Sequence, residues 1–159
     1  MSNDIKQGFE RRIQQSINQI NELRSDDNAD EIIANLAKYL CILISGYTEK
    51  VFIHLIVQHF SVRANPKIVR FISQTYRHTT NLNMEKMLDI LQKFDDNWKD
   101  TILNHLQYDE YSSSIQAIYD NRNKIAHGEN VQVTVTNLET WYHSIQDFFA
   151  YINRLINGS

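Results

Sequence analysis

The chain has 159 residues, with one proline, four glycines, one cysteine and a formal net charge of -3. So few prolines and glycines exclude an all-β fold, which needs many turns, and favour long helices. One cysteine excludes an internal disulfide, and the negative net charge excludes the overall basic field of a protein that coats nucleic acid. We predict a single domain of residues 1–159.

The N-terminal part of the chain carries no secretory signal pattern. Residues 1–30 are polar and charged, without a continuous apolar core. The longest apolar run, residues 39–47, is interrupted by Ser45 and Gly46. It is also shorter than the about 20 residues that a bilayer requires. We therefore expect a soluble, cytoplasmic protein with no membrane partner.

Apolar residues at helical spacing predict two helices in the first part of the chain. The first helix spans residues 4–23 and is ended by the polar run 24–30. Its apolar stripe consists of Phe9, Ile13, Ile17 and Ile20. The second helix spans residues 30–60 and is apolar nearly all round in its middle, which is typical of the central helix of a bundle.

Polar residues with capping side chains mark the starts of the following helices. Asn65 precedes Pro66, and proline is favoured at the first helical position. Asn83 is a candidate N-cap for the next helix, and Asp95 or Asp96 is one for the helix after it.

A short alternating segment separates the last two predicted helices. The first of these, residues 111–128, ends at Gly128, a frequent residue just after a helix. Residues 131–136, VQVTVT, alternate like a strand, although one strand makes no sheet. Thr136 and Glu139 form a capping-box pattern for the last helix. The apolar face of this helix consists of Leu138, Trp141, Ile145, Phe148, Phe149 and Ile152. The chain is therefore predicted to be all-α, a helical bundle with a long central helix and shorter accessory helices.

Arg122 interrupts an apolar stripe. Ile115, Ile118, Arg122 and Ile125 follow one another in steps of three, four and three, which places them on one face of a helix. A guanidinium keeps its charge and is costly to bury without an anion. We therefore expect a carboxylate or a phosphate beside Arg122.

A short motif surrounds this arginine. Arg122 is followed by Asn123 and, after three further residues, by His127. This Arg-Asn-x3-His pattern resembles that of the HEPN superfamily. The segments SGYTEKVF at 45–52 and NLNMEKMLDIL at 81–91 are similar to those of its RiboL-PSP-associated type. The resemblance covers most of the chain.

The resemblance implies a small helical domain that usually dimerises, with the Arg and His of both copies lining one cleft. Many members cleave RNA without metal, so the resemblance also implies an RNA substrate and no cofactor. His127 would move protons while a ribose 2′-hydroxyl attacks phosphorus, and Arg122 would stabilise the extra negative charge. Asn123 would hold the phosphate or orient the imidazole.

The spacing of the motif limits how this site can be built. Arg122 and His127 lie five residues apart, about 140° around an ideal helix, so they do not share a face. The site therefore needs either a helix end that unwinds near Gly128 or a substrate that lies across the helix. One chain offers one such histidine for the two roles of acid and base. We expect a homodimer to supply the second copy across a two-fold axis.

Glu49 is a carboxylate on an apolar stripe of the central helix. The stripe consists of Ile42, Ser45, Glu49, Phe52 and Ile56. Two interpretations stay open. Glu49 pairs with Arg122 as a buried ion pair that fixes the bundle, or it orients Arg122 or His127 at the floor of the cleft.

Most other candidates have structural explanations. The remaining histidines lack the spacing of zinc ligands, so we predict no metal site. Cys41 is interpreted as a small buried hydrophobe, and the aromatic residues of the last helix are interpreted as core. A basic face on the third helix is either solvated or contacts an RNA backbone. The candidate backbone contacts are Lys124, Arg63, Lys67 and Arg70, and Arg77 belongs to the same basic face.

We therefore expect a metal-independent endoribonuclease of a bacterial stress or anti-phage system of the toxin–antitoxin kind. An antitoxin or sensor protein would be a further partner. The alternative is a non-catalytic HEPN module that binds RNA, a nucleotide or a protein, and a plain helical adaptor with a chance motif is a third hypothesis. Some HEPN toxins carry a tyrosine two residues after the histidine, which a partner enzyme modifies. Glu129 stands there in this chain, so we do not expect that mode of neutralisation.

Overall fold

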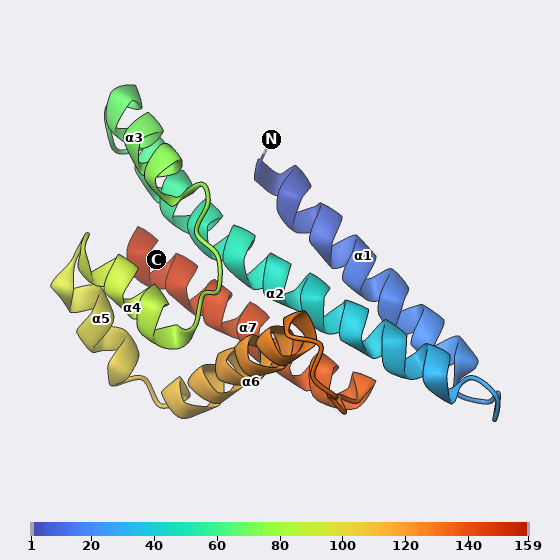
Figure 1. Cartoon of the computed structure of the whole chain (residues 1–159). Coiled ribbons are helices and arrows are strands. Elements are labelled where there is room, and N and C mark those ends of the chain that lie inside the picture. Colours follow the sequence, from blue (N-terminus) through green and yellow to red (C-terminus); the bar gives the residue numbers. More distant parts are fainter. Residues whose placement is uncertain (1, 159) are drawn as a thin grey trace.

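The computed structural model of the chain describes residues 2–158, with side chains from residue 4 onward. The described residues form helices and connections, and no strand occurs among them (Figure 1). In chain order the helices are α1 (Ser2–Leu23), α2 (Asp30–Ser61), α3 (Pro66–Tyr76), α4 (Met84–Gln92), α5 (Asp96–Leu103), α6 (Tyr108–Ala126) and α7 (Val135–Asn157).

The 32-residue α2 is the central helix, and α1, α3, α6 and α7 all pack against it. In Figure 1, α1 lies along one side of α2, whereas α6 and α7 lie on the other side. The chain folds back at the C-terminal end of α2 to form α3. The short helices α4 and α5 pack against each other, and α4 also contacts α6. This arrangement confirms the prediction of an all-α bundle with a long central helix.

The core forms where the apolar faces of α1, α2, α6 and α7 meet. The three largest fully buried side chains are aromatic: Tyr47, Phe52 and Phe148. The predicted stripe of α1 also faces this core, because Ile13, Ile17 and Ile20 are buried and Phe9 packs beside them. Burying one such side chain contributes roughly 1.5–3 kcal/mol to stability. Because Phe148 lies on α7, the aromatic face of α7 is part of the core, as predicted.

Local capping chemistry sets the starts of three helices, α3, α4 and α5, where the sequence predicts them. The side chain of Asn65 accepts a hydrogen bond from Lys67 N, and that of Asn83 accepts one from Lys86 N. Of the two candidates for α5, Asp95 is the N-cap and accepts from Asn97 N. Each side chain satisfies a backbone N–H that has no partner within its helix.

The predicted capping box of the last helix is wrong. The N-cap of α7 is Thr134, whose hydroxyl accepts a hydrogen bond from Asn137 N. Thr136 therefore lies inside the first turn, and its carbonyl accepts a hydrogen bond from the Thr140 hydroxyl. Only Thr136 fits the capping-box pattern, so the local sequence favoured it, and the packing of the preceding segment on α2 moves the helix start to Thr134.

That preceding segment is not a strand. Residues 131–134 connect α6 to α7 without regular secondary structure. Val131 and Val135 are buried, and the segment lines a cavity together with Ile33 and Ala37 of α2. The alternating valines thus cover the N-terminal half of α2, which explains their pattern without strand pairing.

By length and composition, α2 could span a membrane, and it is the one described helix that meets this test. Half of its most apolar window is buried inside the bundle. The core helix of a soluble protein meets the same test, so the apolar character of α2 is accounted for by its central position.

Candidate functional site

The apolar stripe of α6 leaves the core at Arg122. Ile115 and Ile118 are 1% and 2% exposed, whereas Arg122 and Ile125 are only half-buried. The stripe position of Arg122 therefore brings its guanidinium to the edge of the bundle instead of the interior. A half-exposed guanidinium keeps part of its hydration, which removes most of the need for an anion within the chain.

The end of α6 places His127 just outside the helix. Ala126 is the last helical residue, and His127 is the C-cap, with φ −87° and ψ 3°. Gly128 follows with a φ of 71°. Its N–H donates to Ile125 O, and Glu129 N–H donates to Lys124 O, at 3.1 and 2.9 Å. This pair of hydrogen bonds is the Schellman motif, which needs a left-handed residue after the C-cap.

Asn123 contacts both other residues of the motif. Its side-chain oxygen accepts a hydrogen bond from Arg122 Nη1, at 3.1 Å. Its backbone carbonyl accepts one from His127 N–H, at 3.0 Å. The imidazole of His127 is exposed and has no hydrogen-bond partner among the described residues. Asn123 thus fixes the guanidinium on one side and the backbone that carries the imidazole on the other.

Glu49 does not form an ion pair with Arg122, so the first of the two interpretations of this carboxylate is wrong. No ion pair joins these two described residues. Glu49 is 9% exposed, and its Oε1 accepts a hydrogen bond from the backbone N–H of Asn81, at 2.6 Å. A buried carboxylate needs hydrogen-bond donors, and the connection between α3 and α4 supplies one where it crosses α2.

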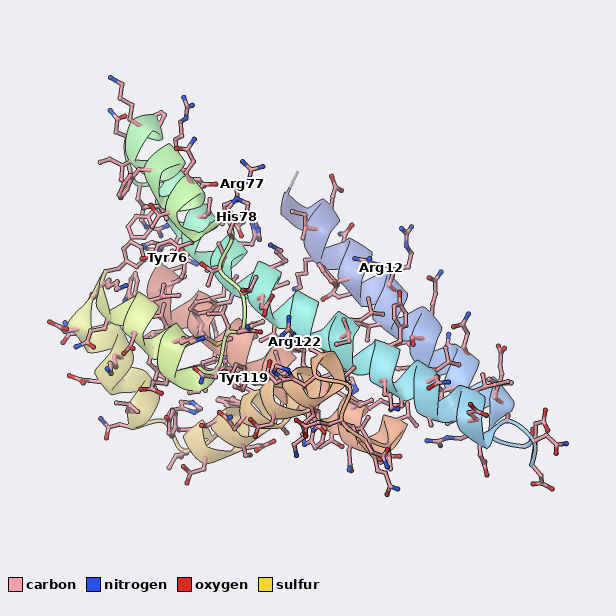
Figure 2. The ribbon with its side chains drawn as sticks, viewed as in Figure 1. Arg12, Tyr76, Arg77, His78, Tyr119 and Arg122 are labelled. Carbon is pink, nitrogen blue, oxygen red and sulfur yellow. The ribbon has the colours of Figure 1, made fainter. Side chains whose placement is uncertain are left out.

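Lys86 of α4 links the connection between α3 and α4 to α6. Lys86 Nζ donates a hydrogen bond to Asn81 O, at 2.9 Å, and lies 5.9 Å from the centre of the Tyr119 ring. Tyr119 precedes Arg122 by one helical turn. Figure 2 shows the side chains of Tyr119 and Arg122 toward the C-terminal end of α6, next to the connection between α3 and α4. Glu49 is therefore linked to the Arg122 region through Asn81, Lys86 and Tyr119, without touching Arg122.

The predicted RNA-backbone contacts do not gather at one place. Lys124 is exposed in the last turn of α6, beside the motif. Lys67 and Arg70 are exposed on α3, which Figure 1 shows at the far end of α2 from the α1–α2 turn. Arg63, in the turn before α3, donates from Nη1 to His59 O, at 3.0 Å.

Basic side chains project from several helices that pack against α2. In Figure 2, Arg12 projects from α1, Arg77 and His78 project from the end of α3, and Arg122 projects from α6. Arg12 lies over the ring of Phe9, with 4.6 Å between its Cζ and the ring centre. These residues come from three distant parts of the chain, so no local spacing could have indicated how they lie around α2.

No group of three or more His, Cys, Asp or Glu side chains in the described part of the chain could hold a metal ion.

The clearest pKa changes concern buried groups outside the motif. Burial raises the pKa of the Cys41 thiol to about 12 and lowers the pKa of His54 below its usual value. Neither group belongs to the Arg122 region.

Comparison with known families identifies the chain. The family description RiboL-PSP-HEPN matches residues 9–158, which is nearly the whole chain. The chain belongs to the RiboL-PSP-HEPN family. No curated protein and no solved structure was found to match it.

Membership confirms the resemblance of this sequence to the HEPN superfamily and supports a nuclease or RNA-related role. HEPN domains commonly act as dimers, which is compatible with a homodimer here. The family match does not test the individual motif residues, so the roles of Arg122, Asn123 and His127 stay predictions.

Proposed function

We propose that the chain is a metal-independent endoribonuclease whose site is built from Arg122, Asn123 and His127. The observation that carries the proposal is the end of α6, where the Asn123 side chain accepts a hydrogen bond from Arg122 and the helix stops one residue before His127. This helix end carries a cation and an exposed imidazole that has no hydrogen-bond partner among the described residues. General acid–base chemistry and charge stabilisation need these two groups.

The charge at the end of α6 supports a cationic role for Arg122. The C-terminal end of a helix carries partial negative charge, which disfavours a bound phosphate. An RNA phosphate beside His127 therefore needs positive charge from side chains. Arg122 and Lys124 supply it, and Arg122 has no anionic partner among the described residues. Its planar fork of donors suits a phosphate that gains negative charge.

The proposed reaction uses only groups of RNA and protein. His127 takes the proton from a ribose 2′-hydroxyl, and the 2′-oxygen forms a bond to the adjacent phosphorus. The bond from phosphorus to the 5′-oxygen breaks, and a second histidine, protonated at the start, gives its proton to that oxygen. Arg122 stabilises the negative charge on the phosphoryl oxygens. The products carry a 2′,3′-cyclic phosphate and a 5′-hydroxyl.

A homodimer would supply the second imidazole across a two-fold axis. Ile42, on the α2 stripe that also carries Glu49, is 39% exposed and offers apolar area for such a contact. Mixing wild-type and His127→Ala subunits tests this point. If one cleft needs both histidines, activity falls as the square of the wild-type fraction. A linear fall would show that each subunit cleaves alone.

The biological setting is part of the proposal. We infer a cytoplasmic protein of a bacterial stress or anti-phage system, controlled by an antitoxin or sensor protein. Contacts of Arg63, Lys67 and Arg70 with an RNA backbone stay a prediction for α3 and the turn before it. Exposed cations on that helix support binding of a polyanion.

The chemistry is tested by the ends of the fragments. RNA incubated with the purified protein in EDTA should yield 2′,3′-cyclic phosphate ends, and an RNA with a 2′-deoxy residue at the cut position should resist. Fragments with 3′-hydroxyl ends, or cleavage that EDTA abolishes, would contradict the proposal. RNA binding without any cleavage would favour a non-catalytic RNA-binding module.

A further inference from the structure

A cavity lies between α1, α2 and the end of α3. Its volume is about 290 Å³. The lining residues fall into an apolar group and a polar group, and neither Arg122 nor His127 is among them. Ligand binding to this cavity can therefore be measured independently of RNA cleavage.

One wall of the cavity is apolar. Ile53 and Val57 lie one turn apart on α2, and Ile5 approaches from the first turns of α1. Ile5 is 50% exposed although it borders a concave surface. Apolar surface in a concave site gains free energy when a ligand removes it from water. This wall therefore suits the apolar body of a ligand.

Two cations without an ion-pair partner among the described residues also line the cavity, and Lys50 lies one turn before Ile53 on α2. Lys50 and Arg77 line the cavity, and neither forms an ion pair or a side-chain hydrogen bond with another described residue. Ser73 adds a hydroxyl that is likewise unpartnered. One carboxylate, that of Glu49, also lines the cavity, and its Oε1 accepts from Asn81 N. Positive charge is therefore in excess.

We propose that this cavity binds a small phosphate monoester. The dianionic phosphate would bind between Lys50 and Arg77, and the ring or short chain would cover Ile53 and Val57. A phosphate matches two separate cations better than a single-charged carboxylate does, and arginine binds phosphate oxygens bidentately. Inorganic phosphate alone would leave the apolar wall exposed to water.

The size of the cavity limits the ligand. Sites for drug-sized ligands span roughly 300–1,000 Å³, and this cavity lies at the lower limit. His54 also lines it, and burial lowers the pKa of this histidine, so its ring is neutral near pH 7 and offers a hydrogen bond without added charge. A ligand with one ring and one phosphate group satisfies these limits.

Phenyl phosphate is a suitable probe, with inorganic phosphate and phenol as its separate halves. We expect phenyl phosphate to bind the full chain in calorimetry, more tightly than either half. In amide NMR spectra its addition should shift the signals of Ile53, Val57 and Thr79. Equal affinity for inorganic phosphate and phenyl phosphate would overturn the proposal, because the apolar wall would then contribute nothing.

Two double variants remove the same charge from different places. Lys50→Gln with Arg77→Gln removes the cavity cations, and Lys93→Gln with Arg154→Gln removes two exposed cations at the end of α4 and on α7. The first should weaken phenyl phosphate binding by about tenfold or more, since charged hydrogen bonds are lost. The second should leave it unchanged. Equal weakening in both would overturn the proposal, because it would indicate only general attraction by net charge.

A third variant fills the cavity without changing charge. Ser73 is exposed at its rim on α3, so Ser73→Phe should leave the fold intact while occupying the space. Loss of phenyl phosphate binding together with an unchanged far-ultraviolet circular dichroism spectrum supports the proposal. Undiminished binding in this variant would place the ligand elsewhere and overturn it.

Discussion

The carboxylate of Glu49 accepts a hydrogen bond from the backbone N–H of Asn81, with 2.6 Å between Oε1 and N. Glu49 lies in the middle of α2, and Asn81 lies in the connection between α3 and α4. Asn81 has a φ of 54°, a left-handed conformation that is uncommon for residues with a Cβ. The contact holds this connection where it crosses α2 (Figure 1).

Removing the Glu49 carboxylate should destabilise the fold. Glu49→Ala leaves the Asn81 N–H without its acceptor and should lower the free energy of unfolding by roughly 1–3 kcal/mol. Glu49→Gln keeps an acceptor oxygen and should cost less. Urea unfolding followed by circular dichroism measures both, with Glu129→Ala as an exposed control. A loss from Glu49→Ala no larger than that from Glu129→Ala would contradict the structural role of this hydrogen bond.

Two glycine substitutions should have opposite signs. Gly128 has a φ of 71° in the Schellman motif, so Gly128→Ala should lower the free energy of unfolding by roughly 1 kcal/mol. Gly8 lies within α1, and a Cβ there would meet nothing within 4 Å. Gly8→Ala should therefore raise the free energy of unfolding by about 0.5–1 kcal/mol. Thermal or urea unfolding gives both values, and stabilisation by Gly128→Ala would show that the helix end is built differently.

The Cys41 thiol should be inert in the native protein. It is fully buried between α2 and α6, and burial raises its pKa to about 12. The thiolate is the reactive form, so a disulfide reagent such as Ellman's reagent should not label the folded chain near neutral pH. Labelling should become complete in concentrated urea. Rapid labelling without urea would mean that the contact of α2 with α6 opens readily.

His54 should make stability depend on pH. Burial lowers its pKa, and the positive charge of Lys6 acts in the same direction. As the pH falls below about 6.5, His54 therefore binds a proton in the unfolded chain at a higher pH than it does in the folded chain. The free energy of unfolding should fall over this range.

Urea unfolding at about pH 7.5 and about pH 5.5 tests this prediction. The loss of stability between the two values should be smaller in His54→Gln than in the wild-type protein. His143→Gln, which changes an exposed histidine of α7, serves as the control and should behave like the wild type. An identical loss in His54→Gln and in the wild type would contradict the effect of burial.

Local chemistry explains why much of the fold was predictable. Asn65, Asn83 and Asp95 cap helices through backbone groups two or three residues away, so the signal lies within a few residues of sequence. The apolar character of α2 indicated its central position in the same way. The start of α7 was misplaced because Thr134 and Thr136 compete for one role, and the packing of residues 131–134 on α2 decides between them.

The candidate site was predictable only in part, because its partners are distant in sequence. The helical stripe correctly indicated that Glu49 is buried, but its partner is a backbone N–H 32 residues further along the chain. The same stripe reasoning placed Arg122 inward. The end of α6 instead lies at the edge of the bundle, where the arginine is half-buried and binds Asn123.

The most direct test of the proposed function is the rate of RNA cleavage by matched variants. Arg122→Ala and His127→Ala should each lower the rate at least about a hundredfold, because each removes a group that acts in the transition state. Arg11→Ala and His143→Ala remove an exposed arginine and an exposed histidine elsewhere, and both should cleave like the wild type. Cleavage that survives Arg122→Ala and His127→Ala at the wild-type rate would contradict the assignment of the site.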